Sequence, residues 1–204
     1  MANAGQGISE GGFLAVLWVL TGLATVLAIG RVLIRSILIK RFHLDDLFSF
    51  LAYVLLVTTM ILATIANPLN YEVSAIIVGE SPMPETSKFD DMVIRLRKWN
   101  VAGQMLFWTA LYCVKLSFMF LYKYVLGSHR TFTRIWYAAL VYIVCCYGIC
   151  LIGVFGQCGN AHYLWTIQGC STSYVAALDQ KLIWVDYFFN VSSDLVGKTS
   201  GLSY

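Results

Sequence analysis

One charged residue, Lys115, stands in the middle of a long apolar stretch. The stretch runs from Val101 to Gly127 and carries few other polar groups. As an α-helix, Val101 to Tyr122 would extend about 32 Å, enough to cross the hydrocarbon core of a bilayer. A lone ammonium group is unfavourable in hydrocarbon. Lys115 therefore either extends its side chain to the nearer membrane interface or meets a carboxylate inside a helix bundle.

The last apolar stretch, residues 181–196, offers such a carboxylate. Asp186, Asn190 and Asp194 recur at every fourth residue and would form one polar stripe on a helix. If this segment crosses the membrane, Asp194 lies about 20 Å along it, while Lys115 lies about 21 Å along its own helix. A contact between Lys115 and Asp194 is therefore geometrically allowed and is our hypothesis. The alternative is an amphipathic surface helix or an exposed tail.

Two adjacent carboxylates, Asp45 and Asp46, begin the second apolar stretch, and Arg31 and Arg35 precede them across a short loop. One interpretation is an N-terminal cap, since acidic residues are stabilised by the helix dipole there. The other is that the aspartates bind Arg31 or Arg35, or the basic end of the third span. These four residues are candidates for a polar site at the cytoplasmic helix ends.

The remaining residue patterns exclude several kinds of protein. The three histidines lie in loops without metal-ligand spacing, and the sequence holds no phosphate-binding glycine loop and no basic patch of the kind that binds nucleic acid. No nucleophile is paired with a general base. We therefore expect no enzyme, no metal, no cofactor and no nucleic-acid partner.

Composition indicates that the lipid bilayer is the main partner of this chain. Of its 204 residues 59% are hydrophobic and only 12% are charged, against about 25% charged in soluble domains. The first basic residue is Arg31, so the amino end lacks the positive region of a cleaved signal peptide. The sequence predicts a multi-pass membrane protein.

The predicted fold class is all-α, a polytopic transmembrane bundle of about five helices in a single domain over residues 1–204. Asn67 is expected to end the second helix, because the residue before a proline resists helical geometry. A long polar connection would then reach Asn100. The expected helices cover approximately residues 12–39, 44–66, 88–124, 134–156 and 180–197.

Basic residues in short loops predict the orientation, because they favour the cytoplasmic side. The first and third loops are basic and must lie on one side, which places the amino terminus outside the cytoplasm. The long second connection also holds basic residues, but five acidic residues balance them. The residues that carry this prediction are Arg31, Arg35, Lys40 and Arg41 in the first loop, and Lys123, Arg130 and Arg134 in the third.

Two of the six cysteines, Cys158 and Cys170, fall together in an extracytoplasmic loop under this topology. Disulfides persist on that side of a membrane, so the pair is a disulfide candidate. Two unpaired thiols are the alternative. The other four cysteines lie within apolar runs and are expected to serve as packing residues.

Several of these motifs together resemble the fungal rhodopsin-domain membrane proteins, a group of seven-helix, receptor-like proteins. The resemblance covers roughly residues 12–196, in the same order. Two departures are that Gly159 follows the first loop cysteine where a proline is usual, and that Lys123 replaces the usual arginine. The matching motifs are Arg31-x3-Arg35 with Lys40 before Asp45-Asp46, Lys115-x-Ser117 with Tyr122-Lys123, the loop cysteines, and Asn190-x3-Asp194.

The resemblance implies a receptor-like integral protein, most simply of the plasma membrane, which binds a small extracellular ligand and an unidentified cytoplasmic signalling partner. Retinal is not expected, because light-driven rhodopsins carry their Schiff-base lysine on the last helix and Lys115 is on the third. The family continues through two further helices, so a truncated form, without function, is one alternative. A transporter or channel subunit, with Lys115, Asp186 and Asp194 along its pathway, is another.

Overall fold

The computed structural model of this chain describes residues 10–39, 44–79, 81–82, 84–126, 130–156 and 173–202. Every regular element within these residues is helical, which confirms the all-α prediction. The helices are α1 (Glu10–Ile34), which continues into a single π-helical segment η1 (Arg35–Ile39), then α2 (Leu44–Val78), α3 (Thr86–Leu126), α4 (Arg130–Gly156) and α5 (Ser173–Leu202).

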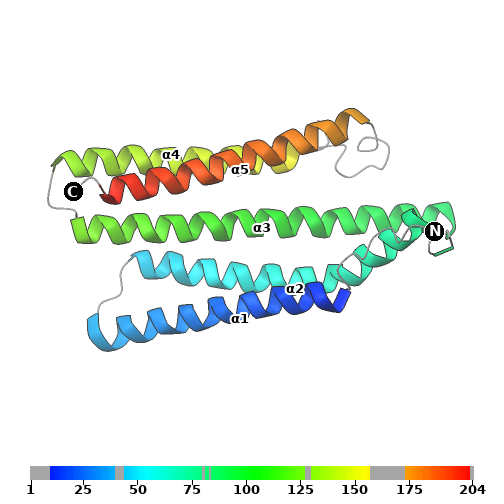
Figure 1. Cartoon of the computed structure of the whole chain (residues 1–204), viewed down its shortest axis with the longest axis horizontal. Coiled ribbons are helices and arrows are strands. Elements are labelled where there is room, and N and C mark those ends of the chain that lie inside the picture. The colour runs from blue at the N-terminus through cyan, green and yellow to red at the C-terminus, as the bar shows by residue number, and fades with distance from the viewer. Residues whose placement is uncertain are drawn as a thin grey trace, which may run out of the picture.

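The central element is α3, which lies between two pairs of helices (Figure 1). On one side α1 and α2 run antiparallel to each other, and on the other side α4 and α5 do the same. The end of η1, the start of α2, the end of α3 and the start of α4 lie at one end of the bundle, and the end of α2 and the start of α3 lie at the other. Polar groups on opposite faces of α3 can therefore reach both pairs.

Four of the described helices are long and apolar enough to cross a membrane: α1 together with η1, α2, α3 and α4. The fifth helix, α5, falls outside this set because Lys181, Asp186 and Asp194 interrupt its apolar residues. It nevertheless lies along α4, where Leu182 approaches Gly156 and Tyr142 bonds to Ser192. The chain is thus a multi-pass membrane protein whose fifth described helix lies against a membrane-spanning neighbour.

The prediction that the second helix ends at Asn67 is wrong. The helix continues through Pro68 to Val78, and the long polar connection shortens to a few residues. A proline inside a membrane helix is tolerated where neighbouring helices and side chains compensate for the missing backbone bond. Here Asn67, Val73 and Ile76 are buried, so packing of this second half stabilises the helix beyond the proline.

Both helices of the α2–α3 hairpin are longer than a bilayer is thick. The 35 residues of α2 and the 41 residues of α3 extend about 52 and 62 Å, against a hydrocarbon core of about 30 Å. Gly79 ends α2 with a positive φ of 84°, and its amide donates to the carbonyl of Ile76 at 3.2 Å. Arg95, Arg97 and Lys98, which the orientation argument counted with the long connection, lie in α3 itself, within the range of the helix expected over residues 88–124.

The best-packed region lies between α3 and α4. Its buried residues form one apolar cluster, in which the indole of Trp136 is almost completely enclosed. Trp136 Nε1 donates to the backbone carbonyl of Met119 at 2.7 Å, so the ring has both apolar contact and a satisfied donor. The ammonium of Lys123 lies 4.2 Å from the centre of the same ring, a cation–π contact. The buried members are Tyr112, Met119, Trp136, Ala139, Ile143, Cys146 and Cys150.

Replacing Trp136 by phenylalanine tests this packing. The substitution removes the bond to Met119 and leaves unfilled space, which should lower the free energy of unfolding by about 2 kcal/mol. The measurement is thermal or denaturant unfolding of the purified protein in detergent micelles. Trp184→Phe is the matched control, because Trp184 is exposed and its replacement should change stability by less than about 0.5 kcal/mol. Equal losses in the two variants would contradict this account of the core.

Candidate functional site

Two groups of polar side chains join the helices inside the bundle. The arginine–aspartate cluster consists of Arg31, Arg35, Asp45, Asp46 and Ser117, and it connects α1, η1, α2 and α3. The lysine cluster connects α3 to α5. It consists of Lys115, Asn190, Ser193 and Asp194. Each cluster contains site candidates that the sequence supplied, together with a serine that was not among those candidates.

In the arginine–aspartate cluster, Asp45 is the shared acceptor. Its Oδ2 lies 3.2 Å from Nη2 of Arg31 and also accepts a bond from Nη2 of Arg35. Asp46 binds the same two arginines through Oδ1, at 3.2 Å from Nε of Arg35 and 3.7 Å from Nε of Arg31. The two positive and two negative charges cancel, which makes the burial of Asp45 and Arg35 tolerable.

Ser117 connects this cluster to α3. Its Oγ accepts a hydrogen bond from Nη2 of Arg31 at 2.9 Å and donates one to the backbone carbonyl of Asp45 at 2.7 Å. Only 1% of the serine is exposed. One hydroxyl group thus links three helices.

The local sequence explains why these charges meet. Arg31 and Arg35 are one helical turn apart and so project from the same side of the chain. They stand at the end of a helix, where the dipole favours cations, and the aspartates stand at the start of the next, where it favours anions. The predicted ion pairs are present. The aspartates also stand at the start of a helix, as the alternative interpretation proposed, so the two interpretations hold together.

In the lysine cluster the ammonium group of Lys115 is surrounded by oxygen atoms of α5. Nζ donates to the backbone carbonyl of Asn190 at 2.8 Å and to its Oδ1 at 2.5 Å. It lies 2.6 Å from Oγ of Ser193 and 3.0 Å from Oδ1 of Asp194. The hypothesis of a Lys115–Asp194 contact is confirmed. The lysine meets a partner inside the bundle instead of extending alone to an interface.

The two partners of this ion pair differ in their surroundings. The side chain of Lys115 is 12% exposed and that of Asp194 is 52% exposed. Ser193 is buried, and its hydroxyl donates to the carbonyl of Asn190 at 2.8 Å, which leaves its lone pairs for Lys115. The lysine is therefore held mainly by enclosed oxygen atoms of Asn190 and Ser193, and Asp194 balances the charge from the rim.

Asp186 does not join the lysine cluster, although it belongs to the same predicted stripe. A spacing of four residues overshoots one helical turn by about 40°, so Asp186 and Asp194 differ in direction by about 80°. Asp186 faces α4 instead, where a Cβ added to Gly153 would stand 3.1 Å from its Oδ1. Asp186 is 6% exposed, and this oxygen has no hydrogen-bond partner among the described residues.

Two positions on α3 organise both clusters. Lys115 and Ser117 are two residues apart, so they point to nearly opposite sides of the helix. Lys115 reaches α5 on one side and Ser117 reaches Arg31 and Asp45 on the other. The third helix thus holds the α1–α2 pair and the α4–α5 pair through polar groups at one level.

The site candidates left out three contributors to these contacts. Ser117 was named only as part of a family motif, and Ser193 was not named. Both are short hydroxyl residues inside apolar runs, and their burial was the signal that the sequence could not supply. Tyr142 joins α4 to α5 by donating to Oγ of Ser192 at 2.8 Å. The predicted disulfide between Cys158 and Cys170 lies outside the described residues.

Replacing Asp45 by asparagine tests which cluster carries more stability. The substitution leaves two partly buried guanidinium groups with one carboxylate and should cost about 3–5 kcal/mol of unfolding free energy. Asp194→Asn is the matched control, since it removes an exposed carboxylate and should cost about 0–1 kcal/mol. Unfolding in micelles, followed by circular dichroism, measures both. A loss for Asp194→Asn as large as that for Asp45→Asn would contradict the assignment of Asp45 as the buried acceptor.

Comparison with known proteins agrees with this arrangement. A family model described as the fungal rhodopsin domain matches residues 30–196. No curated protein and no solved structure matches the chain. The matched range holds all the residues of both clusters and covers well over half of the 204 residues. The chain belongs to the fungal rhodopsin domain family.

Proposed function

We propose that this protein is receptor-like and that a small ligand binds between α3, α4 and α5. The observation that carries the proposal is Asp186, a buried carboxylate whose Oδ1 has no partner among the described residues. An ionisable group in a membrane bundle is costly unless it has a partner, so such groups commonly mark functional sites. A ligand is the partner that we propose for Oδ1 of Asp186, whose carboxylate also lies within hydrogen-bonding reach of the Cys150 thiol.

A second unpartnered atom lies at a similar level of the bundle. Nε1 of Trp108 is buried and has no hydrogen-bond partner among the described residues. The helices α3 and α5 run in the same direction (Figure 1). Measured from the Lys115–Asp194 contact, Trp108 lies about 11 Å back along α3 and Asp186 about 12 Å back along α5. Trp108 also packs against the buried cluster of Val101 on α3 and Val154 on α4. Val154 is the neighbour of Gly153, which Asp186 faces.

The chemistry of the two atoms defines the class of ligand. An indole N–H can only donate and an ionised carboxylate can only accept. A ligand with an ammonium group for Asp186 and an acceptor or aromatic ring near Trp108 and Tyr112 would satisfy both atoms and neutralise the carboxylate. Lys115 does not serve this purpose, because its ammonium group is bound to Asn190, Ser193 and Asp194.

The lysine cluster supports a receptor-like role because three of its four residues lie on α5, the helix that carries Asp186. A ligand that draws Asp186 toward α3 or α4 would shift α5, and the polar contacts at Asn190, Ser193 and Asp194 would have to rearrange. Asp194 is half-exposed, so its contact with Lys115 is the easiest of these to break. Binding at one level would thus alter the helix contacts at another.

Phenethylamine and its neutral analogue phenethyl alcohol test this proposal. The amine should stabilise the purified protein by about 2.7 kcal/mol at about 100 times its dissociation constant, and the alcohol should stabilise it much less. Asp186→Asn should abolish the difference. Gly153→Ala should weaken binding because its methyl group presses on the carboxylate, whereas Gly148→Ala, with open space around it, is the control. Thermal unfolding measures all four proteins.

Hydrogen exchange then separates a receptor from a simple binding protein. The amine should change amide exchange in α5 around Asn190 to Asp194, beyond the binding level itself. An amine effect that persists in Asp186→Asn, or no amine effect at all, would contradict the proposal. An amine-dependent current in proteoliposomes would instead favour a transporter or channel.

We also propose that the amino terminus is extracytoplasmic and that the protein resides in the plasma membrane. The support is the basic character of the sequence between α1 and α2 and between α3 and α4, since the helix ends that these stretches join lie at one end of the bundle (Figure 1). Arg95, Arg97 and Lys98 argue less strongly for the other side, since they belong to α3 and are accompanied by Asp90 and Asp91.

Tags inserted before Phe13 and next to His129 test this orientation. In intact cells an antibody should reach the first tag without permeabilisation and the second only after it. After permeabilisation, microscopy should find both tags at the plasma membrane. Labelling of both from the same side would contradict the topology, and labelling of only the second would reverse it.

A further inference from the structure

A groove between α1 and α2 is a second feature of the bundle, separate from both the Asp186 region and the lysine cluster. Its volume is about 590 Å³. Most of its wall is apolar and comes from Ala28, Ile29 and Val32 of α1 and from Leu47, Phe50 and Tyr53 of α2. Both helices are candidate membrane spans, so a groove of this composition opens toward lipid.

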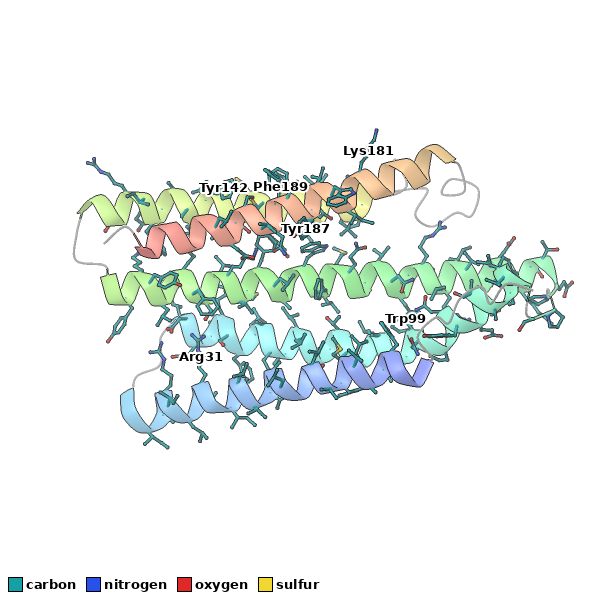
Figure 2. All side chains as sticks on the ribbon, viewed as in Figure 1. Arg31, Trp99, Tyr142, Lys181, Tyr187 and Phe189 are labelled. Atoms are coloured by element: carbon teal, nitrogen blue, oxygen red, sulfur yellow. The ribbon has the colours of Figure 1, made fainter. Side chains whose placement is uncertain are left out.

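One end of the groove is charged. Arg31, Arg35 and Asp46 contribute to its lining. Asp45, which completes the charge balance, is not part of the lining and is buried. Figure 2 shows Arg31 between α1 and α2, near the end of the bundle that holds their connection. The groove therefore has an apolar body, and the arginine–aspartate cluster lies at one end of it.

Arg31 has the most exposed side chain of the three charged residues at this end, and its guanidinium group can donate further hydrogen bonds. Its side chain is 27% exposed, whereas those of Arg35 and Asp46 are 9% and 14% exposed. The contacts of Arg31 with Asp45, Asp46 and Ser117 all involve Nη2 or Nε. A guanidinium has five N–H donors, and such groups bind phosphate oxygen atoms in preference to neutral acceptors.

We propose that this groove binds one anionic phospholipid, with an acyl chain between α1 and α2 and the phosphate against Arg31. From Thr25 to Arg35 the helix extends about 15 Å, which suits much of an acyl chain. Four basic residues and two acidic ones occur between positions 31 and 46, so this stretch of the sequence carries net positive charge. A zwitterionic head group would add a cation beside these arginines, so an anionic head group fits better.

Native mass spectrometry of the full chain in detergent, with dioleoyl phosphatidylglycerol or dioleoyl phosphatidylcholine added, tests the proposal. The wild-type protein should retain one phosphatidylglycerol molecule and prefer it over phosphatidylcholine by about fivefold, the effect of one arginine near an anionic head group. Ala28→Trp should abolish this retention, because the indole fills the groove.

Leu27→Trp is the matched control, since Leu27 is the neighbouring residue, is exposed and does not line the groove. It should retain the lipid as the wild type does. Arg31→Gln, where it folds, should keep lipid binding but lose the preference for phosphatidylglycerol. Equal retention of the two lipids, or full retention in Ala28→Trp, would overturn the proposal. A dimer that Ala28→Trp dissociates would also overturn it, because the groove would then be the binding site of a second copy of the protein.

Discussion

The energetic cost of charge inside a lipid-embedded bundle determines how these helices are arranged. Arg35, Asp45 and Lys115 are all enclosed, and each is acceptable only because oppositely charged or hydrogen-bonding groups surround it. Apolar packing between membrane helices is weakly selective, because lipid tails offer nearly the same contacts. The polar contacts therefore specify which helices are neighbours and at what level they meet.

The two clusters stabilise buried charge in different ways. At Asp45 the carboxylate is enclosed and shared by two arginines, and Ser117 bonds to the backbone of the same residue. At Lys115 the enclosed group is the cation, and its carboxylate partner lies at the rim. The first arrangement fixes the α1–α2 pair on α3. The second connects α5 through enclosed contacts at Asn190 and Ser193 and through one half-exposed contact at Asp194.

The sequence was sufficient to predict the contacts that depend on local patterns. Arg31, Arg35, Asp45 and Asp46 were linked correctly because short spacing and the helix dipole both act over a few residues, and equal depth linked Lys115 to Asp194. It failed at Pro68, where burial of the following turns outweighs the local preference against helix. It also placed Asp186 and Asp194 on one stripe, although the drift of a 3.6-residue helix separates their directions. The partners of Ser117 and Ser193 lie more than 70 residues away and leave no local pattern.

The spacing between Lys115 and Ser117 has a consequence for how this segment can change in length. Deleting or inserting one residue between them would rotate one side chain by about 100° relative to the other. One of the two helix pairs would then lose its polar anchor, whatever residue was added or removed. Conservative substitutions preserve the angle, so this part of α3 accepts exchange of side chains far more readily than a change in the number of residues.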